Sequence, residues 1–251
     1  MLARQKNCPN LFCGQTRGLR DELFTGILTA YPGHETDPRY IFSSTPVPIE
    51  PAELAKSGAA LRERAQLGQA RLWSLLVGGD GAGYRYTEAD WRALAAGLKS
   101  LAQRHAIRWL IATSRRSGSL PETILATELD ATVLAAATFI NTGSRKDASY
   151  PEILGAAERH FATEDSHMMI TEAIATGCPV HTLRPAEYRT DATNLHFLQL
   201  YERDQFITRH DIATLATAVP VNSPAPIRAS APPAEALGKL LQQWWHRVTA
   251  R

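Results

Sequence analysis

The chain contains few cysteines and no long hydrophobic run. Its 251 residues include three cysteines, Cys8, Cys13 and Cys178, and an odd number without a C-x-x-C pair excludes both a disulfide framework and a zinc site of the usual spacing. No apolar stretch approaches the ~18 residues that a membrane-spanning helix needs. The N-terminus also lacks the apolar core of a secretory signal. These absences predict a cytoplasmic protein without a transmembrane segment, and they leave a peripheral membrane contact open.

A strong charge of one sign is also absent. Lysine and arginine number 27 against 25 aspartates and glutamates, which gives a net charge of +2. This balance is too weakly basic to predict nucleic-acid binding. The sequence has no D-x-D motif and no histidine or cysteine spacing typical of a metal site, so we expect no metal and no bound cofactor. The composition, 44% hydrophobic and 21% charged, is that of a globular protein with one large or two small domains.

Strand-like and helix-like patterns alternate through the centre of the chain. Short apolar runs predict strands at residues 71–77, 107–113, 138–141, 160–163 and 180–183. Helical spacing of apolar residues predicts helices at 87–104, 120–129, 150–158, 166–176 and 194–203. Strands separated by helices of this length form a parallel sheet, and right-handed crossovers bring the carboxyl ends of the strands to one edge.

The two ends of the chain are less regular. Short strands are expected at 10–14, 26–30 and 40–43, with a helix at 51–68. Near the C-terminus, a proline-rich linker precedes an apolar helix at 234–248. We therefore predict three parts: a partial N-terminal Rossmann-like domain at 1–70, a C-terminal Rossmann domain at 71–218, and a linker with a C-terminal helix at 219–251.

Residues 165–180 are the most informative segment. They read D-S-x-x-M-x-x-E-A-x-x-T-G-x-P-V, a pattern typical of a strand end, a turn, a helix and a glycine stop. Asp165 and Ser166 are helix N-cap residue types, and the first-turn amides of a helix favour an anion. Glu172 follows Ser166 by nearly two helical turns, close to the same side. A diphosphate at the amides with a ribose hydroxyl at Glu172 is one interpretation, and an ordinary capped helix is the other.

Two further strands end in residues that suit a phosphate ligand. Gly78 and Gly79 follow the first central strand, and glycine lets a backbone approach a ligand closely. Ser114, Arg115 and Arg116 follow the second strand, and guanidinium groups match phosphate oxygens in a bidentate manner. A mobile glycine loop and a solvated arginine loop are the alternatives. Because all these residues follow parallel strands, we expect them to meet Asp165 at one edge of the sheet.

Few residues suggest acid–base chemistry. Asp80 lies in the glycine-rich loop and His34 in a polar, turn-rich stretch, and either is a candidate catalytic base. His167 stands in the first turn of the helix at 166–176, where it can touch a ligand. Glu164 and Asp165 are adjacent and point to opposite sides of an extended segment, so we do not expect them to act as a carboxylate pair.

The motif at 165–180 resembles the sugar-nucleotide motif of GT-B glycosyltransferases and nucleotide-sugar 2-epimerases. It is more similar to that of the mitochondrial-fission "elongated mitochondria" family and its bacterial relatives. Thr113-Ser114-Arg115-Arg116 resembles that family's T-S-R-R segment, and Val77-Gly78-Gly79 resembles its V-G-G strand end. The likeness covers roughly residues 70–210. The chain departs from the family pattern at Met168, where a small residue is usual, and at residues 148–151, where only Tyr150 of an Asn-Pro-Tyr segment is retained.

This resemblance implies an α/β, GT-B-like fold. A Rossmann-like parallel-sheet domain would follow a shortened first α/β domain, onto which the C-terminal helix crosses back. A fragment, a truncated gene model and a naturally reduced form would each explain the short first domain. The implied ligand is a nucleoside-diphosphate sugar, with metal-independent transfer of the sugar to an unknown acceptor. A non-catalytic binding or scaffold protein and a nucleotide-sugar epimerase are the alternatives. The implied binding residues are Gly78, Gly79, Ser114, Arg115, Arg116, Asp165, Ser166, His167, Met169 and Glu172.

Overall fold

The chain forms two compact units, each built on a parallel sheet. The computed structural model describes residues 6, 8–31, 33–34, 36–43, 47–218 and 233–250, so the expected linker at 219–233 lies outside the described residues except for Pro233, which begins a helix. Unit 1 comprises the chain up to Pro48, residues 192–200 and the C-terminal helix, and unit 2 comprises Ile49–Asp191 and residues 201–218. The predicted α/β fold with parallel sheets is confirmed.

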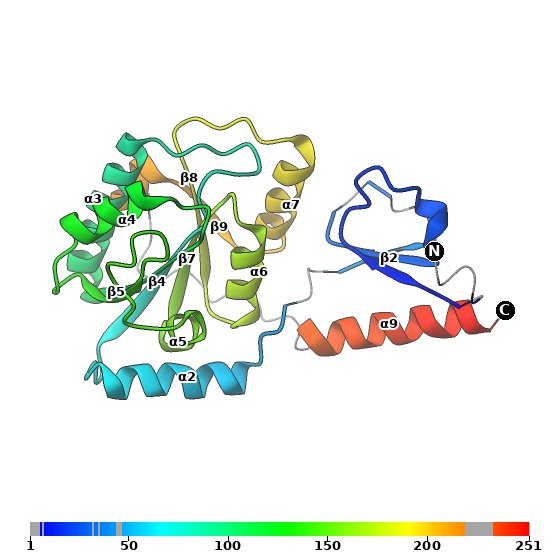
Figure 1. Ribbon diagram of the computed structural model, residues 1–251, viewed down its shortest axis with the longest axis horizontal. Helices are drawn as coiled ribbons and strands as arrows, with labels where there is room; N and C mark the ends of the chain where they lie inside the picture. Colours follow the sequence, from blue (N-terminus) through cyan, green and yellow to red (C-terminus); the bar gives the residue numbers. More distant parts are fainter. Residues whose placement is uncertain are drawn as a thin grey trace. The chain divides into compact units, whose positions relative to one another are not determined.

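Unit 2 contains a six-stranded sheet in the order β6-β5-β4-β7-β8-β9, and every neighbouring pair is parallel (Figure 1). The strands are β4 Arg71–Val77, β5 Ile107–Thr113, β6 Leu134–Thr138, β7 Arg159–Thr163, β8 Val180–Arg184 and β9 Thr208–Asp211. From β4 the sheet continues to β5 and β6 on one side, and from β7 it continues to β8 and β9 on the other. Ligands of open α/β sheets bind beyond the carboxyl ends of the strands at such a switch point.

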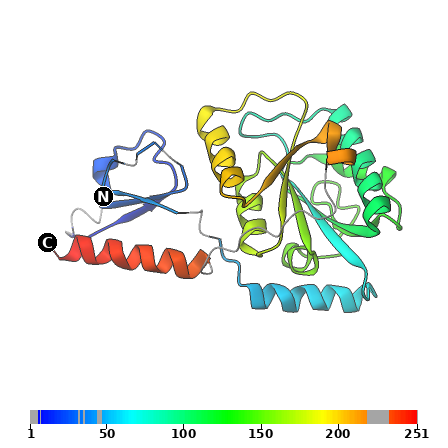
Figure 2. The same ribbon diagram turned by 180° about the vertical axis from the view of Figure 1, so that it is seen from behind.

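Helices cover both faces of this sheet (Figures 1 and 2). They are α2 Pro51–Arg64, α3 Glu88–His105, α4 Ser119–Glu128, α5 Tyr150–Ala156, α6 His167–Ala175, η2 Ile212–Thr214 and α8 Leu215–Ala218. Helix α7 Ala192–Arg203 is divided between the units, with residues 192–200 in unit 1. The start of α3 is fixed by a reciprocal capping box, in which the Asp90 amide donates to Thr87 Oγ1 at 3.2 Å and the Thr87 amide donates to Asp90 Oδ2 at 2.9 Å. Both bonds satisfy amides that the helix itself leaves without partners. Within the described residues, no helix is long and apolar enough to cross a membrane.

Aromatic side chains fill the centre of the unit 2 core. Trp73, Trp109 and Phe161 come from the adjacent strands β4, β5 and β7, and each is at most 1% exposed. Phe161 lies 5.6 Å from the Trp73 ring and 5.1 Å from the Trp109 ring. Trp109 also donates its indole N–H to the Leu98 carbonyl of α3 at 2.9 Å. This bond satisfies a buried donor and fixes α3 against the sheet.

Helix α2 packs on α5 and therefore belongs to unit 2, whereas the sequence boundary at residue 70 assigns it to the first domain. Two glycines allow the helices to approach closely. A Cβ on Gly155 would lie 1.9 Å from the Leu54 carbonyl oxygen, and a Cβ on Gly58 would lie 2.2 Å from the Gly155 carbonyl carbon. Arg62 adds a hydrogen bond of 2.8 Å to the Ala156 carbonyl. The sequence pattern does not show this contact, because it joins segments far apart in the chain.

We expect Gly155→Ala to destabilise unit 2 by about 1–3 kcal/mol, the usual cost of overpacking a close contact. The added methyl group meets backbone of α2 rather than a flexible side chain, so a helix must move. The control is Gly238→Ala, because a Cβ there meets nothing within 4 Å and alanine favours a helix. Chemical denaturation of both variants measures the difference, and equal midpoints would contradict the tight α2–α5 contact.

Unit 1 joins the N-terminal strands to the C-terminal helix. Its parallel sheet has the order β1-β2-β3, with β1 Leu11–Cys13, β2 Gly26–Thr29 and β3 Tyr40–Phe42. The 3₁₀ helix η1 Asp21–Leu23 precedes β2, and α9 Pro233–Thr249 closes the core. Trp244 of α9 packs with Leu28 and Ile41 of the sheet. The expectation that the C-terminal helix crosses back onto the first domain is therefore confirmed.

Candidate functional site

A cavity of about 290 Å³ opens at the carboxyl edge of the unit 2 sheet. It takes residues from the ends of β5 and β6 and from α5 and α6, and four of the predicted binding residues meet there: Ser114, Arg115, Met169 and Glu172. The complete lining is Ala112, Thr113, Ser114, Arg115, Thr138, Ile140, Tyr150, Met169 and Glu172. Apolar side chains therefore form one part of the wall, and a cation, a carboxylate and hydroxyl groups form the rest.

Tyr150 orients Glu172 inside this cavity. The Tyr150 hydroxyl donates to Glu172 Oε2 at 2.7 Å. Burial and the neighbouring carboxylate raise the pKa of Tyr150 far above its ordinary value, so the hydroxyl stays protonated and acts as the donor. A carboxylate can accept several hydrogen bonds, so Glu172 keeps acceptor capacity for a ligand. The sequence identified Tyr150 as a retained family residue but not as a site residue.

Ser114 ties the ends of β4 and β5 together. Its hydroxyl donates to the Gly78 carbonyl, and the Ser117 hydroxyl donates to the Val77 carbonyl at 2.8 Å. The Ser114 amide in turn donates to Ser117 Oγ at 2.9 Å. The Ser114 side chain is therefore engaged within the protein, while Arg115 next to it is exposed.

Gly78 and Gly79 make room for the protein's own atoms. A Cβ on Gly78 would lie 2.2 Å from Asp165 Oδ2. Gly79 has a φ of +117°, and a Cβ there would lie 2.3 Å from the Arg116 carbonyl oxygen. Residues from the ends of β4, β5 and β7 are thus in direct contact, so the predicted convergence of these three segments at one edge is confirmed. The space directly over the two glycines is filled by Asp165 and Arg116.

Asp165 pairs with Arg116 at 3.1 Å. The aspartate side chain is 0% exposed and the arginine side chain 47%. Burial raises the pKa of Asp165 to about 6, although the neighbouring Thr163 hydroxyl and the charge of Arg116 oppose that rise. Since Arg116 already has a carboxylate partner, Arg115 is the arginine left for a ligand in the cavity.

The start of α6 differs from the expected anion site. Ser166 is the N-cap residue but makes no side-chain cap bond, and its amide donates to the Thr163 carbonyl at 3.2 Å. The chain folds into a tight turn at Thr163–Ser166, which engages this amide and aims Asp165 at Gly78 rather than at the helix. Ser166 is therefore the N-cap residue, as its residue type suggested, but it caps the helix without a side-chain hydrogen bond.

Glu164 points to the other side of the strand, as expected for the residue next to Asp165. It is fully buried, and its two oxygens accept bonds of 2.8 and 2.9 Å from the Arg209 guanidinium. The Tyr84 hydroxyl adds a third bond, at 2.9 Å. Glu164 therefore holds β7, β9 and the glycine loop together and takes no part in a carboxylate pair.

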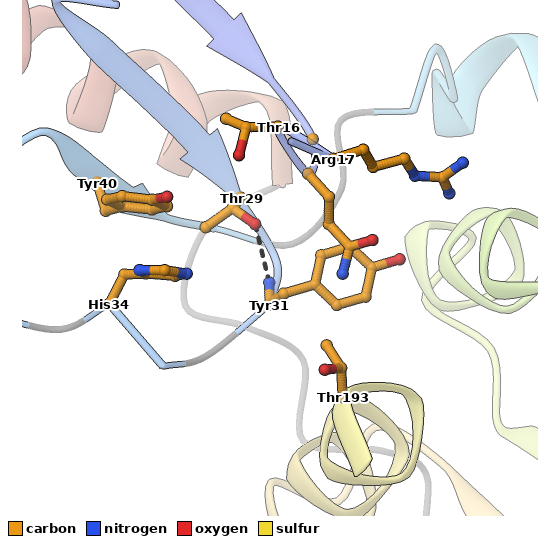
Figure 3. Close-up of a pocket in the computed structure, with 9 residues that line it drawn as sticks. Thr16, Arg17, Thr29, Tyr31, His34, Tyr40 and Thr193 are labelled. Atoms are coloured by element: carbon orange, nitrogen blue, oxygen red, sulfur yellow. Dashed lines mark hydrogen bonds between the residues drawn. The ribbon is translucent and has the colours of Figure 1, made fainter. Parts of the chain in front are cut away.

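The candidate acid–base residues do not line this cavity. Asp80 accepts a hydrogen bond from the Tyr86 amide at 3.0 Å and so shapes the glycine loop. His167 begins α6, and burial lowers its pKa to about 4, so it is neutral at physiological pH. His34 lies in unit 1, stacked on Tyr40 with 4.2 Å between the ring centroids (Figure 3). Among the described residues, no group of three or more His, Cys, Asp or Glu side chains is placed to hold a metal ion.

Glu122 organises one side of the cavity and was missed in the sequence. This buried carboxylate of α4 accepts bonds from Thr113 Oγ1 at 2.6 Å, from the Asn141 amide at 2.9 Å and from the Thr142 amide at 2.6 Å. Its pKa lies below the ordinary value because these hydrogen bonds outweigh the effect of burial. Glu122 thereby fixes the loop that carries Ile140. A glutamate in the first turn of a helix gives no sign of such partners.

Several solved structures resemble the chain, among them two glycosyltransferases and an epimerase. Heptosyltransferase II of Escherichia coli, an ADP-heptose enzyme of lipopolysaccharide, is 14% identical, covers 96% of this chain and 73% of its own, and gives a TM-score of 0.47. UDP-GlcNAc 2-epimerase of Methanocaldococcus jannaschii is 10% identical, with 89% and 62% covered and a TM-score of 0.48. WaaG, a glycosyltransferase of lipopolysaccharide biosynthesis, is 18% identical, with 87% and 55% covered and a TM-score of 0.41.

The chain therefore spans less than two thirds of the epimerase and of WaaG. No curated protein sequence matches it. A family model does match, over residues 28–234, and its description is Mitochondrial fission ELM1. That match extends over most of the 251 residues. The chain belongs to the mitochondrial fission ELM1 family.

Proposed function

We propose that unit 2 binds a nucleoside-diphosphate sugar and that the protein transfers the sugar to an acceptor. The observation that carries this proposal is the cavity in which Ser114, Arg115, Met169 and Glu172 meet. These residues come from two separate motifs of the sequence. Both motifs resemble segments of the mitochondrial-fission family, and that resemblance implies a role in donor binding for these residues.

Each wall of the cavity suits one part of such a donor. Arg115 would pair with the diphosphate, because a guanidinium forms charge-assisted bonds with phosphate oxygens. Glu172, oriented by Tyr150, would accept bonds from ribose hydroxyls. Ile140 and Met169 give an apolar wall for the base. The volume of about 290 Å³ is near the lower end of ligand pockets, ~300–1,000 Å³, and suits the nucleoside and part of the diphosphate.

Transfer would proceed by attack of an acceptor hydroxyl on the anomeric carbon. The bond from that carbon to the diphosphate breaks, the diphosphate oxygen takes the electron pair, and a base takes the hydroxyl proton. Arg115 would stabilise the charge that grows on the leaving diphosphate, so no metal is required for this role. Asp80 and His34 line no part of this cavity, so neither is placed to act as that base.

A second candidate function is binding without transfer. Glu172 is the one carboxylate in the lining, and its place beside Tyr150 suits recognition of hydroxyl groups. A donor site without an acid–base residue would serve a binding or scaffold protein that retains the fold. An epimerase needs acid–base residues in the site as well, so this observation does not favour it.

Calorimetry with a panel of nucleoside diphosphates and the matching nucleosides tests the donor site. We expect Arg115→Ala to weaken diphosphate binding about tenfold or more and nucleoside binding little, because only the diphosphate carries charge to pair. Glu172→Gln should weaken both by about 1–3 kcal/mol, as for a lost bond to a charged acceptor.

The matched control is Arg92→Ala, because Arg92 lies on α3 and pairs with Glu88 and Glu128 without lining the cavity. Its affinities should equal those of the wild type. The donor-site proposal fails if the intact protein binds no nucleoside diphosphate at millimolar concentration. Binding without any sugar transfer to a panel of acceptors would favour the non-catalytic function.

A further inference from the structure

Unit 1 contains a pocket of its own, with a volume of about 260 Å³ (Figure 3). Its lining is Gly14, Gln15, Thr16, Arg17, Thr29, Tyr31, His34, Tyr40 and Thr193. Thr193 belongs to residues 192–200, which form part of unit 1. Most of the lining comes from the loop after β1 and from the end of β2, the carboxyl ends of parallel strands, where open α/β sheets bind ligands. None of these residues lines the cavity of unit 2.

The chemistry of this lining excludes two classes of ligand. No aliphatic side chain of the leucine, isoleucine or valine type lines the pocket, so an apolar molecule would find few contacts there. No carboxylate lines it either, and Arg17 would repel a cation. The side chains present are rich in hydroxyl groups, with one amide from Gln15. Such a surface fits a ligand that carries many hydroxyl groups of its own.

One side of the pocket is a flat aromatic wall. The His34 and Tyr40 rings lie 4.2 Å apart and only 6° from parallel, as Figure 3 shows. Tyr40 is held in place because its hydroxyl donates to Asp21 at 2.7 Å. The face of an aromatic ring carries partial negative charge, so it packs well against the C–H groups on the flat face of a sugar ring.

A cation stands on the other side of the pocket from this wall (Figure 3). Arg17 is exposed, and no ion pair to it is found in the described part of the chain. Arg39, by contrast, is bound to Asp37 at 2.6 Å. The nearby carboxylates therefore have partners already, Asp21 with Tyr40 and Asp37 with Arg39. The positive charge of Arg17 remains available to an anionic group of a ligand.

The pocket has the size of one small ligand. A volume of about 260 Å³ is room for about nine water molecules at ~30 Å³ each, which is close to one monosaccharide. We propose that this pocket binds a polyhydroxylated anion of monosaccharide size, such as a sugar phosphate, with its ring against His34 and its anionic group at Arg17. The site is separate from the proposed nucleotide site, and binding there requires no nucleotide.

Calorimetry of the full chain without nucleotide tests this site, with hexose and pentose phosphates, the parent sugars and inorganic phosphate as probes. We expect at least one sugar phosphate to bind about tenfold or more tighter than its parent sugar and than phosphate, because both halves of the pocket contribute. Arg17→Gln should remove most of the difference between sugar phosphate and sugar. His34→Ala should weaken both ligands.

The matched control is Arg20→Gln, since Arg20 is an exposed arginine of the same loop that does not line the pocket. It should leave every affinity unchanged. Inorganic phosphate binding as tightly as all sugar phosphates would overturn the polyol part of the proposal. Equal effects of the Arg17 and Arg20 changes, or no sugar phosphate bound at millimolar concentration, would overturn the site itself. Displacement of the sugar phosphate by a nucleoside diphosphate would place it in unit 2 and likewise overturn the assignment.

Discussion

Replacing Arg209 by alanine should destabilise unit 2 by about 3–5 kcal/mol, the usual cost of breaking a buried ion pair from one side. Arg209 is 6% exposed, and its partner Glu164 is 0% exposed. The guanidinium occupies both oxygens of Glu164. Without it, a buried carboxylate keeps only neutral donors such as Tyr84 and Thr182. Denaturant unfolding followed by circular dichroism measures the loss.

A second arginine of the same region provides the control. Arg203 pairs with Asp204 at 2.8 Å, but its side chain is 71% exposed. Exposed pairs of this kind contribute little to stability because water screens them, so Arg203→Ala should leave the unfolding midpoint nearly unchanged. If the two variants unfold at the same denaturant concentration, the Glu164 network does not stabilise the sheet as described. The double change of Glu164→Gln with Arg209→Ala should recover part of the loss, since no buried charge is then left unpaired.

Stability should also fall steeply as the pH decreases from about 6.5 towards 4. His160 is buried between Ser74 and Thr176, at 2.7 and 3.0 Å, and burial lowers its pKa to about 4. The unfolded chain therefore takes up the proton first, and the folded state loses stability as the pH falls through this window. A difference of this size corresponds to about 3 kcal/mol for one histidine. Burial likewise lowers the pKa of His181 and His210.

Protonation of Asp165 has the opposite effect on the stability of the fold. Because burial raises its pKa to about 6, the folded state binds this proton before the unfolded state does, which offsets part of the loss below that pH. The histidines outnumber it, so the net effect remains destabilising. Unfolding curves at pH 7, 5.5 and 4.5 for the wild type and for His160→Asn give the check. The free energy of unfolding of the variant should depend less on pH than that of the wild type. If both proteins lose the same stability between pH 7 and 4.5, His160 does not cause the loss.

Most strands were predictable because they are apolar runs buried on both faces, as in β4, β5 and β7. The expected strand at 138–141 was misplaced, since β6 is Leu134–Thr138. Its sequence, L-A-A-A-T, is rich in alanine, which has a low strand propensity, whereas Phe139 and Ile140 look strand-like. In the structure Phe139 is buried after the strand has ended and Ile140 is 48% exposed. Strand β9 was missed because T-R-H-D is polar.

For the candidate site, the topology was predictable and the side-chain directions were not. Parallel strands place their carboxyl ends at one edge whatever the side chains are, so the contact of Gly78, Ser114 and Asp165 follows from the alternation of strands and helices. Asp165 forms its ion pair with Arg116 and not with Arg115, because of the direction in which each arginine side chain leaves the turn. The Tyr150–Glu172 bond depends on the packing of α5 beside α6. Neither of these two contacts can be predicted from the spacing of residues in a single sequence.

The core of unit 1 has a consequence for synthesis of the chain. The core of unit 1 forms only when Trp244 packs against Leu28 and Ile41. Gly26 leaves space for the Trp244 ring, because a Cβ at this position would lie 2.4 Å from Trp244 Nε1. The core of β1–β3 therefore cannot be completed until α9, much later in the chain, has been synthesised. At ~5–20 residues per second, this delay lasts on the order of ten seconds or more. Unit 2 can fold during that time, so the core of unit 1 is completed after unit 2 has formed.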